Sequence, residues 1–207
     1  MLLAMIIVTL ATGASQEAHE RYQPPAEYAR GLLAQPGALR LIFGLDVGFV
    51  VLYTAFFAAF TDYLRGLGRP FVRLALGAMI GTAVLDFIED QHILSLLAVA
   101  EAGRPIDDAA LVFQQTLSAT KWSLSYLALV LYGLAVPRDR WLGIVLSTFL
   151  VAGTLIIGVL GFAAPPAWNP LLDAARTSGL LIGFGLGILW LRAMPEPPPS
   201  LHPQPES

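Results

Sequence analysis

The chain alternates long apolar runs with short polar breaks, and five of the runs are long enough to cross a membrane. About 20 helical residues cross a hydrocarbon core of about 30 Å, because each residue rises about 1.5 Å. The runs are continuous rather than alternating, which favours helices over the strands of an outer-membrane barrel. We therefore predict an all-α, polytopic transmembrane bundle over residues 37–192, with spans at residues 40–60, 72–100, 107–136, 141–163 and 171–191.

The segments that flank these five runs are of three kinds. Residues 1–13 are apolar but too short to span comfortably, so they form either a thin first transmembrane helix or a signal segment. Residues 14–36 are polar, and we predict an extracytoplasmic loop with one short helix near residues 26–34. Residues 193–207 are rich in proline, which predicts a disordered tail.

Charge gives the bundle an orientation. Arginines gather in alternate breaks, at Arg65, Arg69, Arg73, Arg138, Arg140 and Arg192. These breaks fall on one side if the spans simply alternate, and the positive-inside rule makes that side cytoplasmic. We expect a protein of the cell membrane, inner or plasma, with its C-terminus in the cytoplasm and the lipid bilayer as its surroundings.

Composition agrees with a membrane protein and narrows its chemistry. Hydrophobic residues make up 56% of the chain and charged residues only 13%, outside the range of soluble domains. The net charge of −3 and the lack of a basic cluster with aromatics argue against nucleic acid as a partner. With no cysteine in the sequence, disulfides and thiol chemistry are excluded, and no cofactor is predicted.

The apolar run at residues 72–100 contains Asp86, Glu89, Asp90 and His92. An ionisable side chain in hydrocarbon costs about 3 kcal/mol or more, so a cluster of them marks a candidate functional site. The only lysine, Lys121, lies in the next apolar run. Three carboxylates near one lysine leave excess negative charge, which a proton or a cation would neutralise.

Depth and spacing suggest that these groups meet. Asp46, Asp86, Lys121 and Arg176 each lie roughly 20–25 Å from the arginine-rich ends of their runs, a common depth. Helical spacing then places polar side chains of three runs on inward faces. We expect Asp86 to pair with Lys121, with Glu89 or Asp46 as the competing partner. The site for a proton, an ion or a substrate is formed by Asp46, Tyr53, Asp86, Glu89, Asp90, Lys121 and Ser125.

Three functions remain open from this pattern. The first, which we favour, is proton- or cation-coupled transport of a small solute. The second is a structural or accessory subunit in which the charges form an ion-pair network that selects helix partners. The third is a membrane-embedded enzyme that modifies lipid, with Glu89, Asp90 and His92 as acid–base groups or metal ligands; one imidazole is a weak candidate for a metal site. No catalytic residue is assigned, and the pattern favours a protein that is not an enzyme.

Other patterns are more typical of packing. Gly179, Gly183 and Gly187 recur every four residues, which indicates a close helix–helix contact, within the chain or across a homodimer. Asp173 and Arg176 are spaced as a local ion pair, although Arg176 could instead join the cluster. Aromatic residues near the predicted span ends are interpreted as interfacial anchors; they are Trp122, Tyr126, Tyr132, Trp141, Trp168 and Trp190.

These inferences predict the effect of removing single carboxylates. Asp86→Asn should alter activity or ion response far more than Asp62→Asn or Asp139→Asn, because the latter two positions lie in predicted turns rather than inside a span. The comparison is made in whichever transport or turnover assay the protein supports. Equal tolerance at all three positions would remove the site hypothesis.

Overall fold

The computed structural model describes residues 1–194, and every regular element in this part of the chain is helical. The all-α prediction is therefore confirmed. Of the predicted tail at residues 193–207, everything from residue 195 onward lies outside the described residues.

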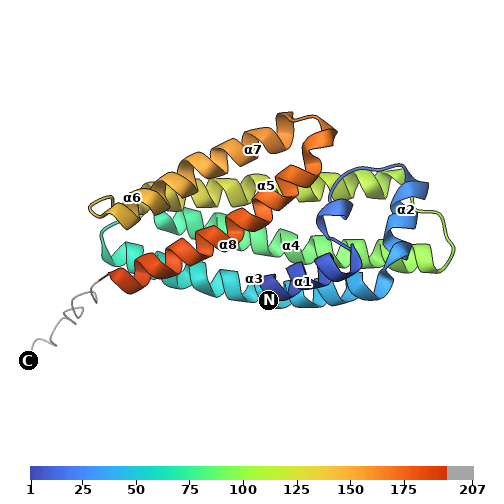
Figure 1. The fold of residues 1–207 in the computed structure, drawn as a ribbon, viewed down its shortest axis with the longest axis horizontal. Coiled ribbons are helices and arrows are strands. Elements are labelled where there is room, and N and C mark those ends of the chain that lie inside the picture. The colour runs from blue at the N-terminus through green and yellow to red at the C-terminus, as the bar shows by residue number, and fades with distance from the viewer. Residues whose placement is uncertain (195–207) are drawn as a thin grey trace, which may run out of the picture.

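Three long helices form the body of the bundle and run side by side along its length (Figure 1): α3 (Pro36–Gly66), α4 (Val72–Glu101) and α5 (Asp108–Ala135). Sequence explains where they begin and end. Pro36 occupies the first turn of α3, where its missing N–H is not needed, and Asp107 caps α5 by accepting from Ala109 N at 3.2 Å. The turn after α4 uses Gly103 at φ +65°, which an L side chain would resist.

A second group of helices packs against this body. α6 (Trp141–Thr148), the π-helical turn η2 (Phe149–Gly153) and α7 (Thr154–Ala163) follow one another without a break and pack on α5. After the short turn η3 (Pro166–Trp168), α8 (Asn169–Ala193) returns diagonally across the bundle (Figure 1). The diagonal path takes α8 from the α3 side of the bundle at its C-terminal end to α7 at its N-terminal end (Figure 1).

The N-terminal segment does not lie on the surface as an ordinary loop. α1 (Leu2–Thr12) packs along α3, with the Met1 side chain beside Gly48. The chain then turns at Gly13 into the short helix η1 (Glu17–His19) before α2 (Pro25–Ala34) packs on α4. The predicted short helix at residues 26–34 is present, but the polar stretch before it enters the bundle.

Only some of the predicted spans are supported by length and apolarity. In the part of the chain that the structure describes, three segments are long and apolar enough to cross a membrane: Pro36–Gly66, Trp141–Ala163 and Pro166–Ala193. α4 and α5 are equally long, but the charged and polar side chains that they carry lower their apolarity. A membrane protein is therefore supported, whereas five spans are not confirmed.

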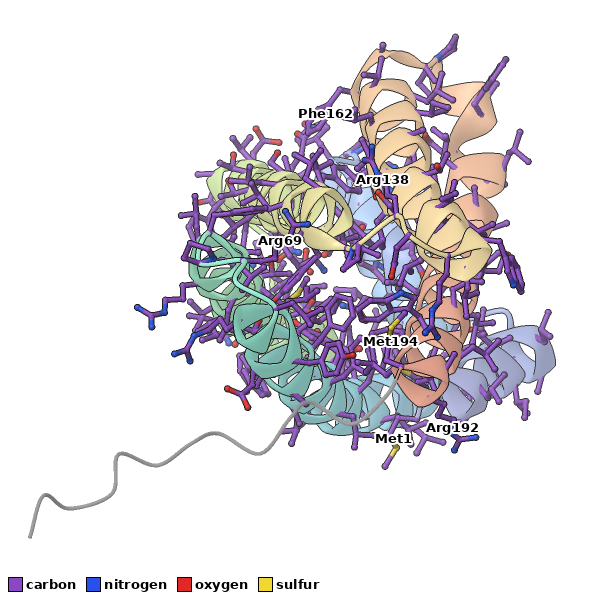
Figure 2. All side chains as sticks on the ribbon, turned by 90° about the vertical axis from the view of Figure 1, so that its left-hand side faces the viewer. Met1, Arg69, Arg138, Phe162, Arg192 and Met194 are labelled. Carbon is purple, nitrogen blue, oxygen red and sulfur yellow. The ribbon has the colours of Figure 1, made fainter. Side chains whose placement is uncertain are left out.

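The arginine-rich breaks do share one end of the bundle. Figure 2 looks onto this end, which we call the arginine end, and labels Arg69, Arg138 and Arg192 there. It consists of the turn between α3 and α4, the turn before α6 and the last turn of α8. The alternation of long helices that the sequence predicted is thus present.

Two apolar cores hold the helices together. The larger lies toward the arginine end, between α3, α4, α5, α6 and α8, and the smaller joins α2, α3 and α4. Trp190 and Tyr132 are fully buried in the larger core, and Trp122 and Tyr126 turn toward polar partners inside the protein. The interpretation of Trp190 and Tyr132 as interfacial anchors was therefore wrong, because span-end position does not reveal which face a side chain occupies; for Trp122 and Tyr126, which are half-buried, it stays a prediction. Trp141 and Trp168 are exposed.

The glycines of α8 face neighbours within the same chain. A Cβ at Gly187 would lie 2.8 Å from the Phe56 ring, and one at Gly183 would lie 3.4 Å from Phe149. A Cβ at Gly179 would be in ordinary contact with Ile157. The stripe thus allows α8 to approach α3 and the helix before it; a homodimer through these glycines stays a prediction.

The close contact of α5 with the η2 turn at Gly133 predicts a steric effect. A Cβ at Gly133 of α5 would lie 2.8 Å from Leu150 Cβ and 3.2 Å from the Ser147 carbonyl oxygen, so Gly133→Ala must push the η2 turn away. We expect a loss of about 1–3 kcal/mol of stability, measured as a lower Tm in detergent.

Gly44→Ala is the matched control, because Gly44 is also helical and a Cβ there meets nothing within 4 Å. Both substitutions gain the same helix propensity. Equal Tm values for the two variants would show that the α5–η2 contact is looser than described.

Candidate functional site

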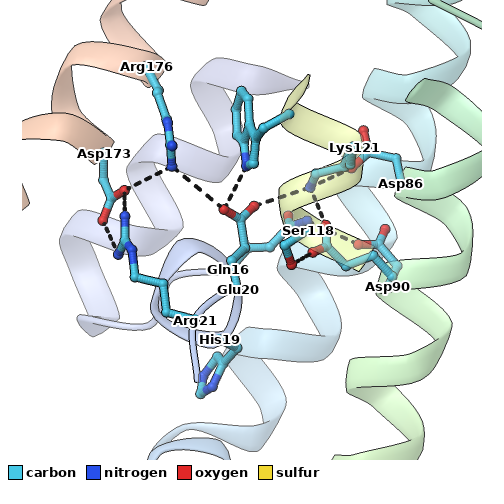
Figure 3. Close-up of polar contacts among 12 residues, drawn as sticks. Gln16, His19, Glu20, Arg21, Asp86, Asp90, Ser118, Lys121, Asp173 and Arg176 are labelled. Carbon is cyan, nitrogen blue, oxygen red and sulfur yellow. Dashed lines mark hydrogen bonds and ion pairs between the residues drawn. The ribbon is translucent and has the colours of Figure 1, made fainter. Parts of the chain in front are cut away.

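Lys121 is the centre of a buried cluster of charges (Figure 3). Its ammonium contacts three carboxylates: Asp86 Oδ1 at 2.9 Å, Glu20 Oε1 at 3.1 Å, and Glu89 in close contact. Lys121 is 3% exposed and Glu89 is fully buried, so water does not screen these pairs. The expected pairing of Asp86 with Lys121 is present, and two further carboxylates complete it.

Each partner is held in place by neutral donors. Tyr53 donates its hydroxyl to Asp86 Oδ2 at 3.2 Å. Glu89 accepts from Gln114 Nε2 at 3.1 Å and from the Ser118 hydroxyl in a short contact. These donors come from α3 and α5, so the α4 carboxylates are satisfied from both sides, as buried charges need to be.

Glu20 reaches this cluster from the N-terminal segment. The turn around η1 directs its side chain into the bundle, where Glu20 is 5% exposed. Its second oxygen accepts from the Trp122 indole N–H at 2.8 Å and lies 4.0 Å from the Arg176 guanidinium. The sequence analysis missed Glu20, because polar residues before the first long span are typical of a surface loop.

Two groups of the N-terminal segment have shifted pKa values. Burial alone would raise the pKa of Glu20, but Lys121, Trp122 and Arg176 stabilise its carboxylate and hold the pKa below its usual range. Burial lowers the pKa of His19 to about 4, so this imidazole is neutral at pH 7. Glu20 is therefore charged and His19 is uncharged where the segment enters the bundle.

Asp46 and Asp90 form a second, different part of the site. Both are buried, and their carboxyl groups are close enough to interact with each other. Gln16 Nε2 donates to Asp90 Oδ1 at 3.1 Å, but Asp46 Oδ2 and Asp90 Oδ2 accept from no N–H or O–H of the described residues. Two buried carboxylates that interact repel each other unless one of them is protonated, so this arrangement favours a proton shared by the pair.

Arg176 and Asp173 of α8 border the cluster on the far side. The predicted local pair of Asp173 with Arg176 is present, with the charged atoms 3.7 Å apart. Asp173 also accepts hydrogen bonds from both terminal guanidinium nitrogens of Arg21. Arg176 donates to the Tyr126 hydroxyl at 3.1 Å and lies over the Trp122 ring. Arg176 thus serves both as a local partner and as a link from α8 to Glu20 (Figure 3).

A cavity of about 830 Å³ opens beside these groups. Asp46, Tyr53, Asp86, Lys121 and Ser125 line its polar part, together with Glu20 and Arg176. Its other part is lined by aromatic side chains of α3, η2 and α8: Phe49, Phe56, Phe57, Phe60, Phe149 and Phe184. A π-helical turn such as η2 is often found where a helix lines a functional site.

The remaining candidates occupy different surroundings. His92 lies away from Lys121, with Nδ1 2.7 Å from Gln114 Oε1 and its ring against Phe113. No group of three or more His, Asp or Glu side chains in residues 1–194 is placed to hold a metal ion. The interpretation of Glu89, Asp90 and His92 as a metal set therefore gains no support, because Asp90 faces Asp46 and His92 faces Gln114.

All seven predicted site residues lie in this region. Asp86, Glu89 and Lys121 form the ion-paired part, Asp46 and Asp90 form the carboxyl pair, and Tyr53 and Ser125 line the adjoining cavity wall. Their common depth along three helices is the property of the sequence that predicted that they lie close together. Gln16, Glu20 and Trp122 had to be found from the structure.

Neither protein-family models, nor curated proteins, nor solved structures gave a match to this chain. Over residues 1–194 the fold is all-helical, with three helices long and apolar enough to cross a membrane and with a buried cluster of acidic residues.

The ion pairs predict an asymmetry between their members. Lys121→Met leaves buried Asp86 and Glu89 without a counterion, and Glu20 with Arg176 alone, and should cost on the order of 3–5 kcal/mol at pH 8. The loss should be smaller at pH 5, because protonation removes the unpaired charges. Asp86→Asn leaves Lys121 with two carboxylates and should cost much less.

Thermal unfolding in detergent from pH 5 to 9 measures both effects, with the double variant included to detect coupling. Arg65→Met is the matched control, since the Arg65–Asp62 pair is exposed and 3.8 Å long. A Lys121→Met variant as stable as the wild type at pH 8 would contradict the described pairing.

Proposed function

We propose that this chain is a polytopic membrane protein that couples the movement of a small solute to protonation of the Asp46–Asp90 pair. In this proposal all five long helices cross the bilayer, with the arginine end in the cytoplasm, and the cavity beside Lys121 receives the solute. The observation that carries the proposal is a pair of neighbouring buried carboxyl groups in which Asp46 Oδ2 and Asp90 Oδ2 accept no hydrogen bond from the described residues.

The exposed faces of α4 and α5 support five spans. On α4 the charged residues Asp86, Glu89 and Asp90 are buried, and the side chains exposed between Leu74 and Ile88 are apolar, whereas Gln91 is exposed beyond them. On α5, where Lys121 is buried, large apolar side chains also point outward, interspersed with exposed polar side chains at Gln115, Thr116, Thr120 and Ser123. The large outward apolar residues of the two helices are Leu74, Ile80, Val84, Ile88, Val112, Phe113, Leu127 and Leu134. Polar stripes inside and apolar side chains outside are the arrangement that lipid requires, whatever the average apolarity of the helix.

An ion-pair network alone accounts for only part of the site. Helix pairing explains Lys121 with Glu20, Asp86 and Glu89, because all four groups are satisfied. It does not explain Asp46 and Asp90, since two apolar or amide side chains would pack there without the cost of a buried acid pair. A role in binding and releasing a proton explains why this costly carboxyl pair is present, because titration changes the charge of the pair beside a cavity.

Removal of either carboxyl should abolish coupling. Proteoliposomes carry pyranine in the lumen, and a panel of amines, amino acids, sugars and carboxylates is added outside. We expect at least one class to change the lumenal pH with wild-type protein and with Asp62→Asn, but not with Asp46→Asn or Asp90→Asn, which cannot exchange the proton.

Infrared difference spectroscopy provides a second readout that needs no solute. The wild type should show a protonated carboxyl band on acidification that is lost in Asp46→Asn and in Asp90→Asn. An unchanged band in both variants, with no solute response in the wild type, would exclude the proposal.

A further inference from the structure

We infer that the solute is a hydrophobic organic cation that occupies the aromatic part of the cavity with its charge against Asp46. This inference rests on the proposed function and names its substrate class. Its starting point is the sign of the charge that the protein leaves uncompensated at the cavity.

The cations at the cavity are already neutralised. Lys121 has three carboxylate partners, and Arg176 lies near Glu20 and Asp173. Arg21 is held by Asp173 through both guanidinium nitrogens. An anionic ligand would therefore have to displace an existing carboxylate before it could pair with any of these groups.

The carboxyl groups, by contrast, outnumber their partners. Glu20, Asp46, Asp86, Glu89 and Asp90 face Lys121 and Arg176, so one proton on the Asp46–Asp90 pair still leaves a negative balance. Asp46 lines the cavity, is 4% exposed and keeps Oδ2 without a donor. A cation in the cavity beside the Asp46 carboxyl group would supply a partner of opposite charge, as a charge-assisted contact in a site of low dielectric.

The shape and lining of the cavity define the remainder of the ligand. Next to Asp46 along α3 are Phe49, Phe56 and Phe57, and Phe149 and Phe184 face them from η2 and α8. Phe184 packs edge-on against Phe49 and Phe56, with centroids 5.9 and 5.2 Å apart. Aromatic faces attract cations and bury apolar groups, so the lining suits an alkyl or aryl onium or amine. A volume of about 830 Å³ is ample for such a molecule.

Proton and cation would then compete for one carboxyl pair. The charged or titratable groups that face Asp46 come from every element around it: Tyr53 on α3, Asp86, Glu89 and Asp90 on α4, and Lys121 on α5. Arrival of a cation at Asp46 favours release of the shared proton, and arrival of a proton favours release of the cation. Exchange of one for the other across the membrane is the coupling that this geometry allows.

Tetraphenylphosphonium and tetraphenylborate test the inference, because they share size and shape but differ in the sign of their charge. Binding to the purified full-length protein in detergent is measured by equilibrium dialysis from pH 5 to 9, corrected for partition into empty micelles. We expect tetraphenylphosphonium alone to bind, more tightly as pH rises. Its charge is permanent, so the pH dependence belongs to the protein.

Asp46→Asn should weaken tetraphenylphosphonium binding by about tenfold or more and remove its pH dependence. Asp62→Asn, the same change at an exposed site, should leave both unaltered. Phe184→Leu keeps the fold apolar at that position and should weaken binding without changing its pH dependence.

Three outcomes would overturn the inference: equal binding of the borate, no binding of the phosphonium to wild type, or unchanged affinity in a folded Asp46→Asn variant. Proton release on binding, followed in weakly buffered solution, separates the two proposals. Phosphonium binding with no Asp46-dependent proton release would uphold the cation site and reject coupling. An Asp46-dependent carboxyl band with no phosphonium binding would uphold the proton site and reject the cation.

Discussion

The structure depends on placing one ammonium among three carboxylates in an interior that excludes water. Lys121 on α5 is paired with Asp86 and Glu89 on α4 and with Glu20 on the N-terminal segment. None of these charges is tolerated alone in such surroundings, since each unpaired ion would cost several kcal/mol. The pairing therefore fixes the register of α4 against α5 and draws a polar segment from outside the long helices into the bundle.

The same constraint explains the contrast between the two halves of the site. Around Lys121 every group has a partner, and the packing there needs no further ligand. Around Asp46 and Asp90 two oxygens have none, although both residues are buried. An acid pair of this kind lowers the stability of the fold, because apolar side chains would pack at the same positions at a lower cost in free energy. That difference is why we place the chemistry at the pair and assign a positioning role to Lys121.

The cavity exists because of how the second group of helices lies on the first. α8 crosses the bundle diagonally, and close contacts at Gly133 and Gly187 bring its neighbours near at the arginine end. Farther along, α8 diverges from α3, and phenylalanines from both helices line the opening. Arg176 ties the diverging end back to Glu20, so the polar side of the cavity is bordered by residues from every layer. An apolar chamber that ends in an acid pair follows from this crossing.

The sequence determined the helical class, the positions of the long helices and the depth at which their charges meet, because apolar runs and helical rise are local properties. It also identified Asp86 and Lys121 as partners, since both lie about equally far from the arginine end. It could not determine that Glu20 and Gln16 enter the bundle, because the path of a polar segment depends on which hydrogen-bond and ion-pair partners are available inside the bundle. Nor could it assign Tyr132 and Trp190 to the interior, or distinguish the satisfied carboxylates from the unsatisfied pair. Those distinctions depend on contacts between residues far apart in the chain, and only the tertiary structure decides them.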